Sequence, residues 1–107
     1  MFPKKRRITK IVFDNVLKNG YVLQSPLFTV RFLKSNPTKQ SQFAVVAPKS
    51  IAKGAVLRNS LRRKGYRAIQ AINANPTATT LIFYKKPAIT ATFEEIKTDL
   101  EVLLKKI

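Results

Sequence analysis

The sequence predicts an α+β fold, a small two-layer α/β sandwich in the order helix, strands, helix, strand, helix. In three segments, apolar residues recur at steps of three and four, the periodicity of a helix with one buried side. Between these segments lie short runs of β-branched and aromatic residues, as is typical of strands. With 107 residues, 45% of them hydrophobic, the chain is expected to form one domain, residues 1–107.

The first predicted helix covers about residues 9–20. Thr9 is a suitable N-cap, and Asn19-Gly20 is a suitable C-cap because glycine adopts the left-handed conformation at little cost. An apolar stripe at helical spacing lies between them, formed by Val12, Phe13, Val16 and Leu17. Residues 1–7 are a basic N-terminal arm, either a frayed end or a phosphate-binding segment.

Three further segments predict strands. Residues 21–34 are predicted to form a strand interrupted at Ser25-Pro26. One face of its second half is apolar (Phe28, Val30, Phe32), and the other can be accessible to solvent (Thr29, Arg31). Residues 42–47 are almost wholly apolar, which favours a central strand. Residues 80–84 are the last strand. If the strands at 42–47 and 80–84 are parallel, a right-handed crossover is the default.

Residues 49–72 carry seven basic side chains and no acidic one. A helix is expected from about Gly54 to Ile72. Its predicted buried side consists of Gly54, Leu57, Leu61, Gly65, Ala68 and Ile72. Its opposite side gathers Asn59, Arg62, Arg63, Tyr66, Arg67 and Gln70, with Arg58 on the flank. Gly65 is costly inside a helix, so it indicates close approach to the sheet or, alternatively, a kink.

The last helix begins with a capping box, in which Thr92 and Glu95 satisfy each other's backbone N–H groups. Its apolar residues again step by three and four, and are Phe93, Ile96, Leu100, Leu103 and Ile107. We expect this helix to cover one face of the sheet.

The charge is strongly unbalanced. The chain has 21 Lys and Arg against 5 Asp and Glu, a net charge of +16, and Asp14 is the one acid before residue 92. A protein surface with so large an excess of positive charge calls for an anionic partner, either RNA, DNA or an acidic membrane surface. Arginine matches phosphate geometry with two parallel hydrogen bonds. The simpler alternative is a solvated helix face that keeps the protein soluble.

Little in the sequence points to catalysis by the chain itself. It has no His and no Cys, the commonest general base and nucleophile, and we predict no catalytic residue and no metal site. Glu95 and Asp99, one turn apart, are better explained by capping and solubility than by a shared cation. No apolar run is long enough to span a bilayer and no signal segment follows the N-terminus, so we expect a cytoplasmic protein without a membrane partner.

Four segments together resemble the bacterial ribonuclease P protein component. The most specific is Arg58-Asn59-Ser60-Leu61-Arg62-Arg63, preceded by Lys49 and Ala55-Val56, which is similar to the Arg-Asn-Arg helix of that family. The others are the start Phe2 to Ile8, the segment Phe13 to Gly20, and the last helix from Thr92 to Leu104. Ser60 replaces the third residue of the triplet, Gly65 a bulkier apolar residue, and Leu17 and Arg31 replace aromatics.

The resemblance implies a left-handed strand–helix–strand crossover, in place of the right-handed default. It implies a catalytic RNA subunit that uses magnesium, bound chiefly by that RNA, to remove the 5′ leader of precursor tRNA. The residues implied to bind the RNA subunit are Lys49, Lys53, Arg58, Asn59, Arg62, Arg63 and Arg67. A cleft with Phe13, Leu17 and Arg31 is implied to hold the single-stranded leader.

Two alternatives share the charge of this chain. A ribosomal-type RNA-binding assembly protein has a similar composition and fold class. A stand-alone, metal-dependent nuclease would require convergent carboxylates or imidazoles, which the sequence does not offer.

Overall fold

The computed structural model describes residues 10–34, 42–72 and 78–107. Its four-stranded sheet has the order β1-β2-β4-β3, with β1 at Tyr21–Gln24, β2 at Phe28–Lys34, β3 at Gln42–Val46 and β4 at Ala78–Tyr84. The helices are α1 (Lys10–Asn19), α2 (Ala55–Ile72) and α3 (Phe93–Lys105), with a short 3-10 helix, η2 (Lys86–Thr90), after β4. The predicted α+β class and element order are confirmed, whereas the basic arm and the Thr9 cap lie outside the described residues.

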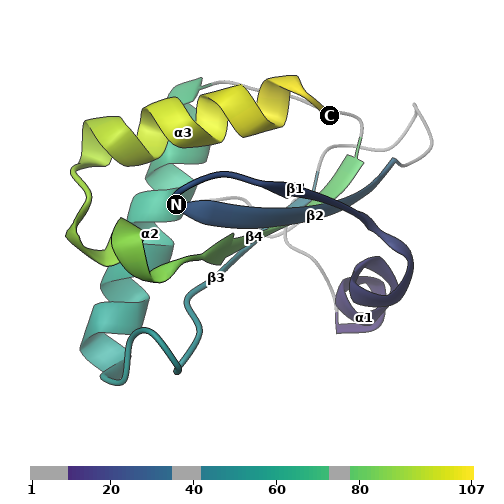
Figure 1. Ribbon diagram of the computed structural model, residues 1–107. Helices are drawn as coiled ribbons and strands as arrows, with labels where there is room; N and C mark the ends of the chain where they lie inside the picture. The colour runs from purple at the N-terminus through teal and green to yellow at the C-terminus, as the bar shows by residue number, and fades with distance from the viewer. Residues whose placement is uncertain (1–9, 35–41, 73–77) are drawn as a thin grey trace.

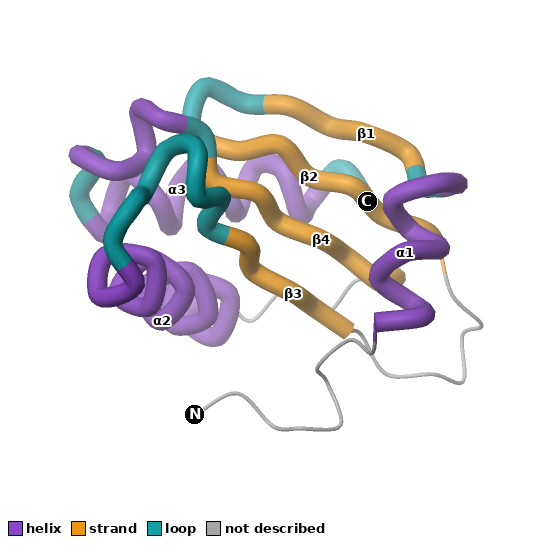
Figure 2. Tube along the Cα trace, turned by 90° about the horizontal axis from the view of Figure 1, so that it is seen from below, coloured by secondary structure: helices purple, strands orange, loops and turns teal. Residues whose placement is uncertain are grey.

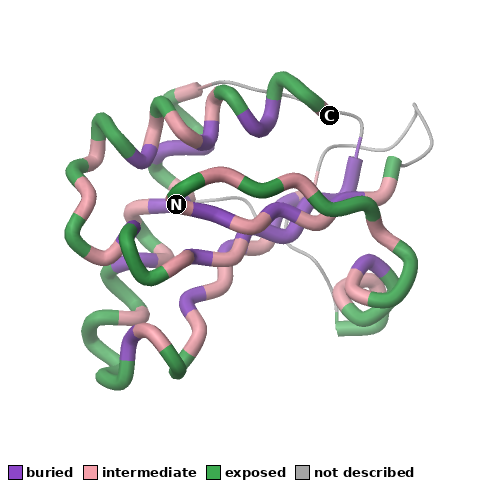
Figure 3. Tube along the Cα trace, viewed as in Figure 1, coloured by how far each residue is buried: buried purple, intermediate pink, exposed green. Residues whose placement is uncertain are grey.

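Helices α2 and α3 cover one face of the sheet, and α1 lies against the other face (Figures 1 and 2). The core is buried between the sheet and the α2–α3 layer (Figure 3). Its largest members, all nearly inaccessible to solvent, are Phe28, Phe43, Leu61, Ile69, Ile82, Ile96, Leu100 and Leu103. Burial of such side chains contributes about 1.5–3 kcal/mol each. It therefore fixes α2 and α3 on the sheet.

The interruption predicted at Ser25-Pro26 is the turn of an antiparallel hairpin. Strands β1 and β2 pair with Tyr21 opposite Phe32 and Gln24 opposite Thr29. The Ser25 hydroxyl accepts a hydrogen bond from the Phe28 N–H at 3.0 Å, and the Ser25 N–H donates to the Phe28 carbonyl at 2.9 Å. The serine therefore closes the turn with both its side chain and its backbone.

Strand β3 lies at an edge of the sheet, so the prediction of a central strand was wrong. Among the described strands it pairs with β4 alone, in parallel, while β4 pairs antiparallel with β2 on its other side. Its apolar composition has another cause, since Phe43 and Val45 are buried beneath the helices and the Val45 N–H donates to the Tyr66 hydroxyl of α2 at 3.2 Å. The connection from β3 through α2 to β4 is left-handed (Figure 2).

Two glycines are required by close contacts. A Cβ on Gly65 would lie 2.8 Å from Val45 Cγ1 and 3.2 Å from the Tyr84 hydroxyl, so close approach to the sheet, and not a kink, explains this residue. A Cβ on Gly20 would lie 2.4 Å from the Val16 carbonyl oxygen. Gly20 follows α1 as predicted, but its φ is not in the left-handed region expected for it.

The buried side of α2 begins at Leu61, about two turns later than the predicted start at Gly54. Leu61, Gly65 and Ala68 are buried as expected, and Ile69 joins them, whereas Gly54 and Leu57 are exposed. The first turn of α2 therefore extends beyond the edge of the core. The apolar residues there recur at helical spacing but do not pack on the sheet.

The capping box of α3 is confirmed. The Thr92 hydroxyl accepts from the Glu95 N–H at 3.2 Å, and the Glu95 carboxylate accepts from the Thr92 N–H at 2.9 Å. These hydrogen bonds, the one from the Thr92 backbone first, hold the pKa of Glu95 below its ordinary value. Of the predicted apolar face, Ile96, Leu100 and Leu103 are buried.

Candidate nucleic-acid interface

The outer side of α2 is the most cationic surface that a single element of the described structure presents. Asn59, Arg63 and Arg67 are exposed, while Arg62 and Lys64 are half-buried. Leu61, Gly65, Ala68 and Ile69 anchor the opposite side in the core. A helix fixed in this way holds its guanidinium groups on a rigid support, which reduces the entropy lost when they bind phosphate.

These cations have no acidic partner in the described structure. Across residues 10–34, 42–72 and 78–107, the one ion pair joins Lys105 and Glu101 at 3.2 Å, both in α3. None of the guanidinium groups of α2 is thus neutralised by a described carboxylate. Arg62 donates to the side-chain oxygen of Asn59, one turn earlier, which orients its guanidinium without cancelling its charge.

Arg58 differs from the other arginines of α2. Its Nη1 donates to the carbonyl oxygens of Ala52 at 3.0 Å and Lys53 at 2.8 Å. It therefore ties the first turn of α2 to the loop that precedes it. Lys49 and Lys53, both exposed, belong to that same loop. The structure thus gives Arg58 a role in shaping the N-terminal end of the basic helix, in addition to its charge.

A groove lies on each flank of α2. One, of about 400 Å³, is lined by Asn59, Arg62, Arg63 and Tyr66. The other, of about 420 Å³, lies between α2 and the start of α3 and is lined by Val56, Ser60, Arg63, Lys64, Arg67 and Phe93. Arg63 borders both grooves. Each groove combines cations with one aromatic ring, the side-chain chemistry that suits a nucleotide.

The second predicted cluster lies at the other end of the sheet, where α1 packs on β2 and β4 (Figure 2). The Phe13 ring meets the Phe83 ring edge-on, with centroids 6.3 Å apart. Arg31 Nη1 donates to the Leu17 carbonyl at the end of α1, at 3.1 Å. Phe13, Leu17 and Arg31 are all half-buried, so the structure brings these three residues together around α1 and leaves part of each accessible.

Three aromatic residues of these surfaces were missed from the sequence. Phe83 is half-buried on the α1 face of β4, between the buried Ile82 and Tyr84. Successive side chains of a strand point to opposite faces, so Phe83 was expected on the face opposite Ile82 and Tyr84, and this was the available signal for it. From the sequence, Tyr66 was predicted on the polar side of α2 and Phe93 on the buried side of α3, and neither residue was given a binding role. Only the packing of α2 beside α3 brings Phe93 next to the cations.

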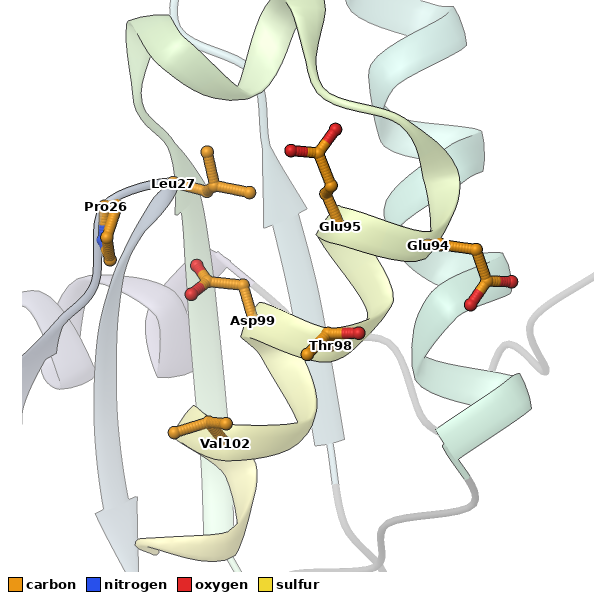
Figure 4. A pocket seen from close by; sticks show the side chains of 7 residues that line it. All are labelled: Pro26, Leu27, Glu94, Glu95, Thr98, Asp99 and Val102. Atoms are coloured by element: carbon orange, nitrogen blue, oxygen red, sulfur yellow. The ribbon is translucent and has the colours of Figure 1, made fainter.

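The acids of α3 form a separate groove away from the cations. It is lined by Pro26, Leu27, Glu94, Glu95, Thr98, Asp99 and Val102 (Figure 4). Asp99 accepts a hydrogen bond from the Ser25 hydroxyl, and Glu95 is engaged in the capping box. Both carboxylates thus have structural partners. Within the described part of the chain, no three acidic side chains gather in a way that would hold a metal ion.

The sequence matches the family model described as Ribonuclease P over residues 2–107. The chain belongs to the ribonuclease P protein family. Since the match spans almost the whole chain, the ribonuclease P assignment covers the α1 cluster and the α2 surface alike.

Solved structures of ribonuclease P proteins share this fold. The protein from Staphylococcus aureus superposes with a TM-score of 0.82 at 21% identity, with 94% of each chain covered. The protein from Thermotoga maritima superposes with a TM-score of 0.79 at 24% identity, with 89% of this chain and 90% of that one covered. No curated protein matches the sequence. No described helix is long and apolar enough to traverse a bilayer.

Proposed function

We propose that this ribonuclease P protein binds the catalytic RNA subunit through the outer side of α2 and holds the 5′ leader of precursor tRNA beside α1. The observation that carries the proposal is the set of α2 cations without carboxylate partners among the described residues. Burying that surface against phosphate relieves its self-repulsion and releases counterions.

The expected contact is with RNA shape and phosphate. The deep groove of A-form RNA is closed to side chains, so a helix that bears arginines docks on the backbone. Lys49, Lys53, Asn59, Arg62, Arg63 and Arg67 form the proposed RNA-subunit surface. Arg58 contributes charge there and also orders the loop that carries Lys53.

The leader contact follows from the chemistry around α1. Leaders vary in sequence, so the protein must contact features that all leaders share, which are the backbone phosphates and the flat faces of the bases. The accessible parts of Phe13 and Phe83 offer stacking surfaces, which tolerate any base and are worth about 1–3 kcal/mol per base. Arg31 supplies a cation beside them, although one of its nitrogens is engaged with Leu17.

The chemistry of cleavage is assigned to the RNA subunit and to magnesium bound chiefly by that RNA. This chain has neither His nor Cys, and its described acids form no metal site. Its part in the reaction is to neutralise phosphates, so that RNA and metal ions can approach one another, and to position the leader. We expect this work to take place in the cytoplasm.

Reconstitution tests the proposal. A ribonuclease P RNA with limiting magnesium is mixed with precursor tRNA, with and without the protein. The proposal requires cleavage at the leader junction to be accelerated by the protein and to be absent with protein alone. Cleavage by protein alone would favour a stand-alone nuclease. Failure to activate the RNA, together with co-purification with ribosomal particles, would favour a ribosomal assembly protein.

A further inference from the structure

We propose that the groove between α2 and the start of α3 is a second RNA subsite, which takes one unpaired nucleotide. This inference rests on the proposed function, since it assigns to the same RNA a contact beyond the outer side of α2. The groove is lined by Val56, Ser60, Arg63, Lys64, Arg67 and Phe93.

The size of the groove suits such a ligand. At about 420 Å³ it falls within the range of small-molecule sites, roughly 300–1,000 Å³. A nucleotide fits that space, whereas a paired helix does not enter it and instead rests on the rim.

Its charge selects for an anion. Arg63, Lys64 and Arg67 line the groove from α2, and no carboxylate is part of the lining. Glu94, the residue after Phe93, is not part of this lining. The Ser60 hydroxyl adds a donor that can reach a phosphate or a ribose oxygen. Ser60 thus stands in this groove where the family has a third residue of its triplet.

Its apolar part selects for a base. Phe93 is half-buried and packs against the core, so its ring is held in place while its remaining surface borders the groove. Val56, 84% exposed, borders the same space and is among the most exposed apolar side chains described. A base whose two faces are covered in a duplex cannot lie on this ring. An unpaired base can, and it covers apolar surface that is otherwise left in water.

The position of Arg63 joins the two grooves. It borders both the Tyr66 groove and the Phe93 groove, so it stands on the ridge between them. An RNA strand that crosses α2 can keep its phosphates on the cations of this ridge and turn one base into the Phe93 groove. The aromatic residue adds a contact that selects single strands, which the arginines alone do not provide.

The experiment uses the absence of tryptophan from this chain. In Phe93→Trp, the indole is the single tryptophan and reports stacking by quenching of its fluorescence. The probe is a short single-stranded RNA, compared with a hairpin duplex of the same length. We expect saturable quenching by the single strand, at least fivefold weaker binding of the duplex, and loss of the signal when Lys64→Glu is added.

Val102→Trp is the matched control. Val102 is also on α3 and 51% exposed, but it lines the acidic groove, so its tryptophan should not be quenched. A non-aromatic variant, Phe93→Leu, keeps apolar bulk and should weaken binding of the RNA subunit by about 5- to 100-fold, as loss of one stacked base does.

The outcomes separate the two proposals. If the RNA subunit binds Phe93→Trp without quenching and binds Phe93→Leu with unchanged affinity, the groove proposal is overturned and the proposed function stands. If the unmodified protein fails to bind the RNA subunit, both fall. Equal quenching by an acidic peptide and by RNA would make the groove a general anion site and would also overturn the assignment to a nucleotide.

Discussion

The Tyr84 hydroxyl donates a hydrogen bond of 2.6 Å to the Leu61 carbonyl, joining the end of β4 to the middle of α2. Both residues are buried, so the bond lies directly beneath the helix that carries the cationic surface. The position of that surface relative to the sheet therefore depends on one phenol as well as on apolar packing.

We expect Tyr84→Phe to lower the free energy of unfolding by about 1 kcal/mol at neutral pH, because the hydrogen bond is lost. Burial raises the pKa of Tyr84 above its ordinary value, so the phenol stays neutral in the native state. The unfolded phenol ionises above about pH 10. The stabilising contribution of Tyr84 is therefore complete below pH 10 and declines above it.

Urea unfolding of both proteins between pH 8 and pH 11 measures this effect. The difference in stability between the native protein and Tyr84→Phe should shrink as the pH rises past 10. A difference that stays constant across that range would contradict a raised pKa for Tyr84.

Gly65→Ala should destabilise the fold even though alanine favours helices. The added Cβ would meet Val45 Cγ1 at 2.8 Å, and overpacking of a core costs about 1–3 kcal/mol against about 1 kcal/mol gained in helix propensity. We expect a net loss of about 1 kcal/mol, measured by thermal unfolding. In a Val45→Ala background the same change should be neutral or favourable. Additive effects would argue against the contact.

Arg63→Ala should affect RNA binding alone, whereas Arg58→Ala should affect both RNA binding and stability. Arg63 is exposed, so its loss should weaken binding of the RNA subunit about tenfold and leave stability unchanged. Arg58 holds the carbonyls of Ala52 and Lys53, so its loss should also lower stability by about 1 kcal/mol.

Filter binding across a salt series and circular dichroism separate these two effects. Affinity should fall by about 0.7–0.9 log units per tenfold rise in salt for each phosphate neutralised, and Arg63→Ala should lower that slope by about one phosphate. A flat salt response of the unmodified protein would remove α2 as the RNA contact.

Phe13→Leu should reduce discrimination between precursor and mature tRNA in the reconstituted enzyme. Leucine keeps much of the packing on Phe83 but removes the ring, so precursor affinity should fall about fivefold or more and mature tRNA affinity should not change. Ile11→Ala is the control on the same helix, because Ile11 is 83% exposed. Equal losses for both RNAs would indicate a packing role for Phe13.

Thr92→Ala should cost about 1 kcal/mol through loss of the α3 N-cap. The same box makes stability fall in acid, since the lowered pKa of Glu95 means that its contribution is present above about pH 4.3 and is lost as the pH falls through the lowered value. Acid unfolding followed by circular dichroism should show a smaller decline in Glu95→Gln. An unchanged decline would assign it to other carboxylates.

The sequence predicted the elements well because each carried a local signal. The capping box of Thr92 and Glu95 and the turn at Ser25-Pro26 are chemical features that need no knowledge of tertiary structure. The position of β3 could not be predicted in this way. An apolar strand is compatible with the centre of a sheet or with an edge covered by a helix, and the strand pairing in the structure decides between them.

The candidate site also has a part that local sequence patterns predict and a part that depends on tertiary structure. Arginines on one side of a helix follow from periodicity, so the position of Arg62, Arg63 and Arg67 on the side of α2 away from the core could be predicted. The internal role of Arg58 depends on the path of the preceding loop, and the proximity of Phe93 to α2 depends on how two helices lie on the sheet. Neither the hydrogen bonds of Arg58 nor the proximity of Phe93 to α2 produces a local sequence pattern from which it could be predicted.

The Tyr66 hydroxyl that accepts from the Val45 amide also bears on self-association. A border strand with unpaired amides is a template on which a neighbouring molecule can add its own strand and start an aggregate. Here Tyr66 of α2, the helix that carries the proposed RNA-binding cations, occupies one of those amides, and a net charge of +16 makes copies repel one another. We therefore expect the same helix and charge that suit an RNA partner to limit aggregation of the protein when it is alone.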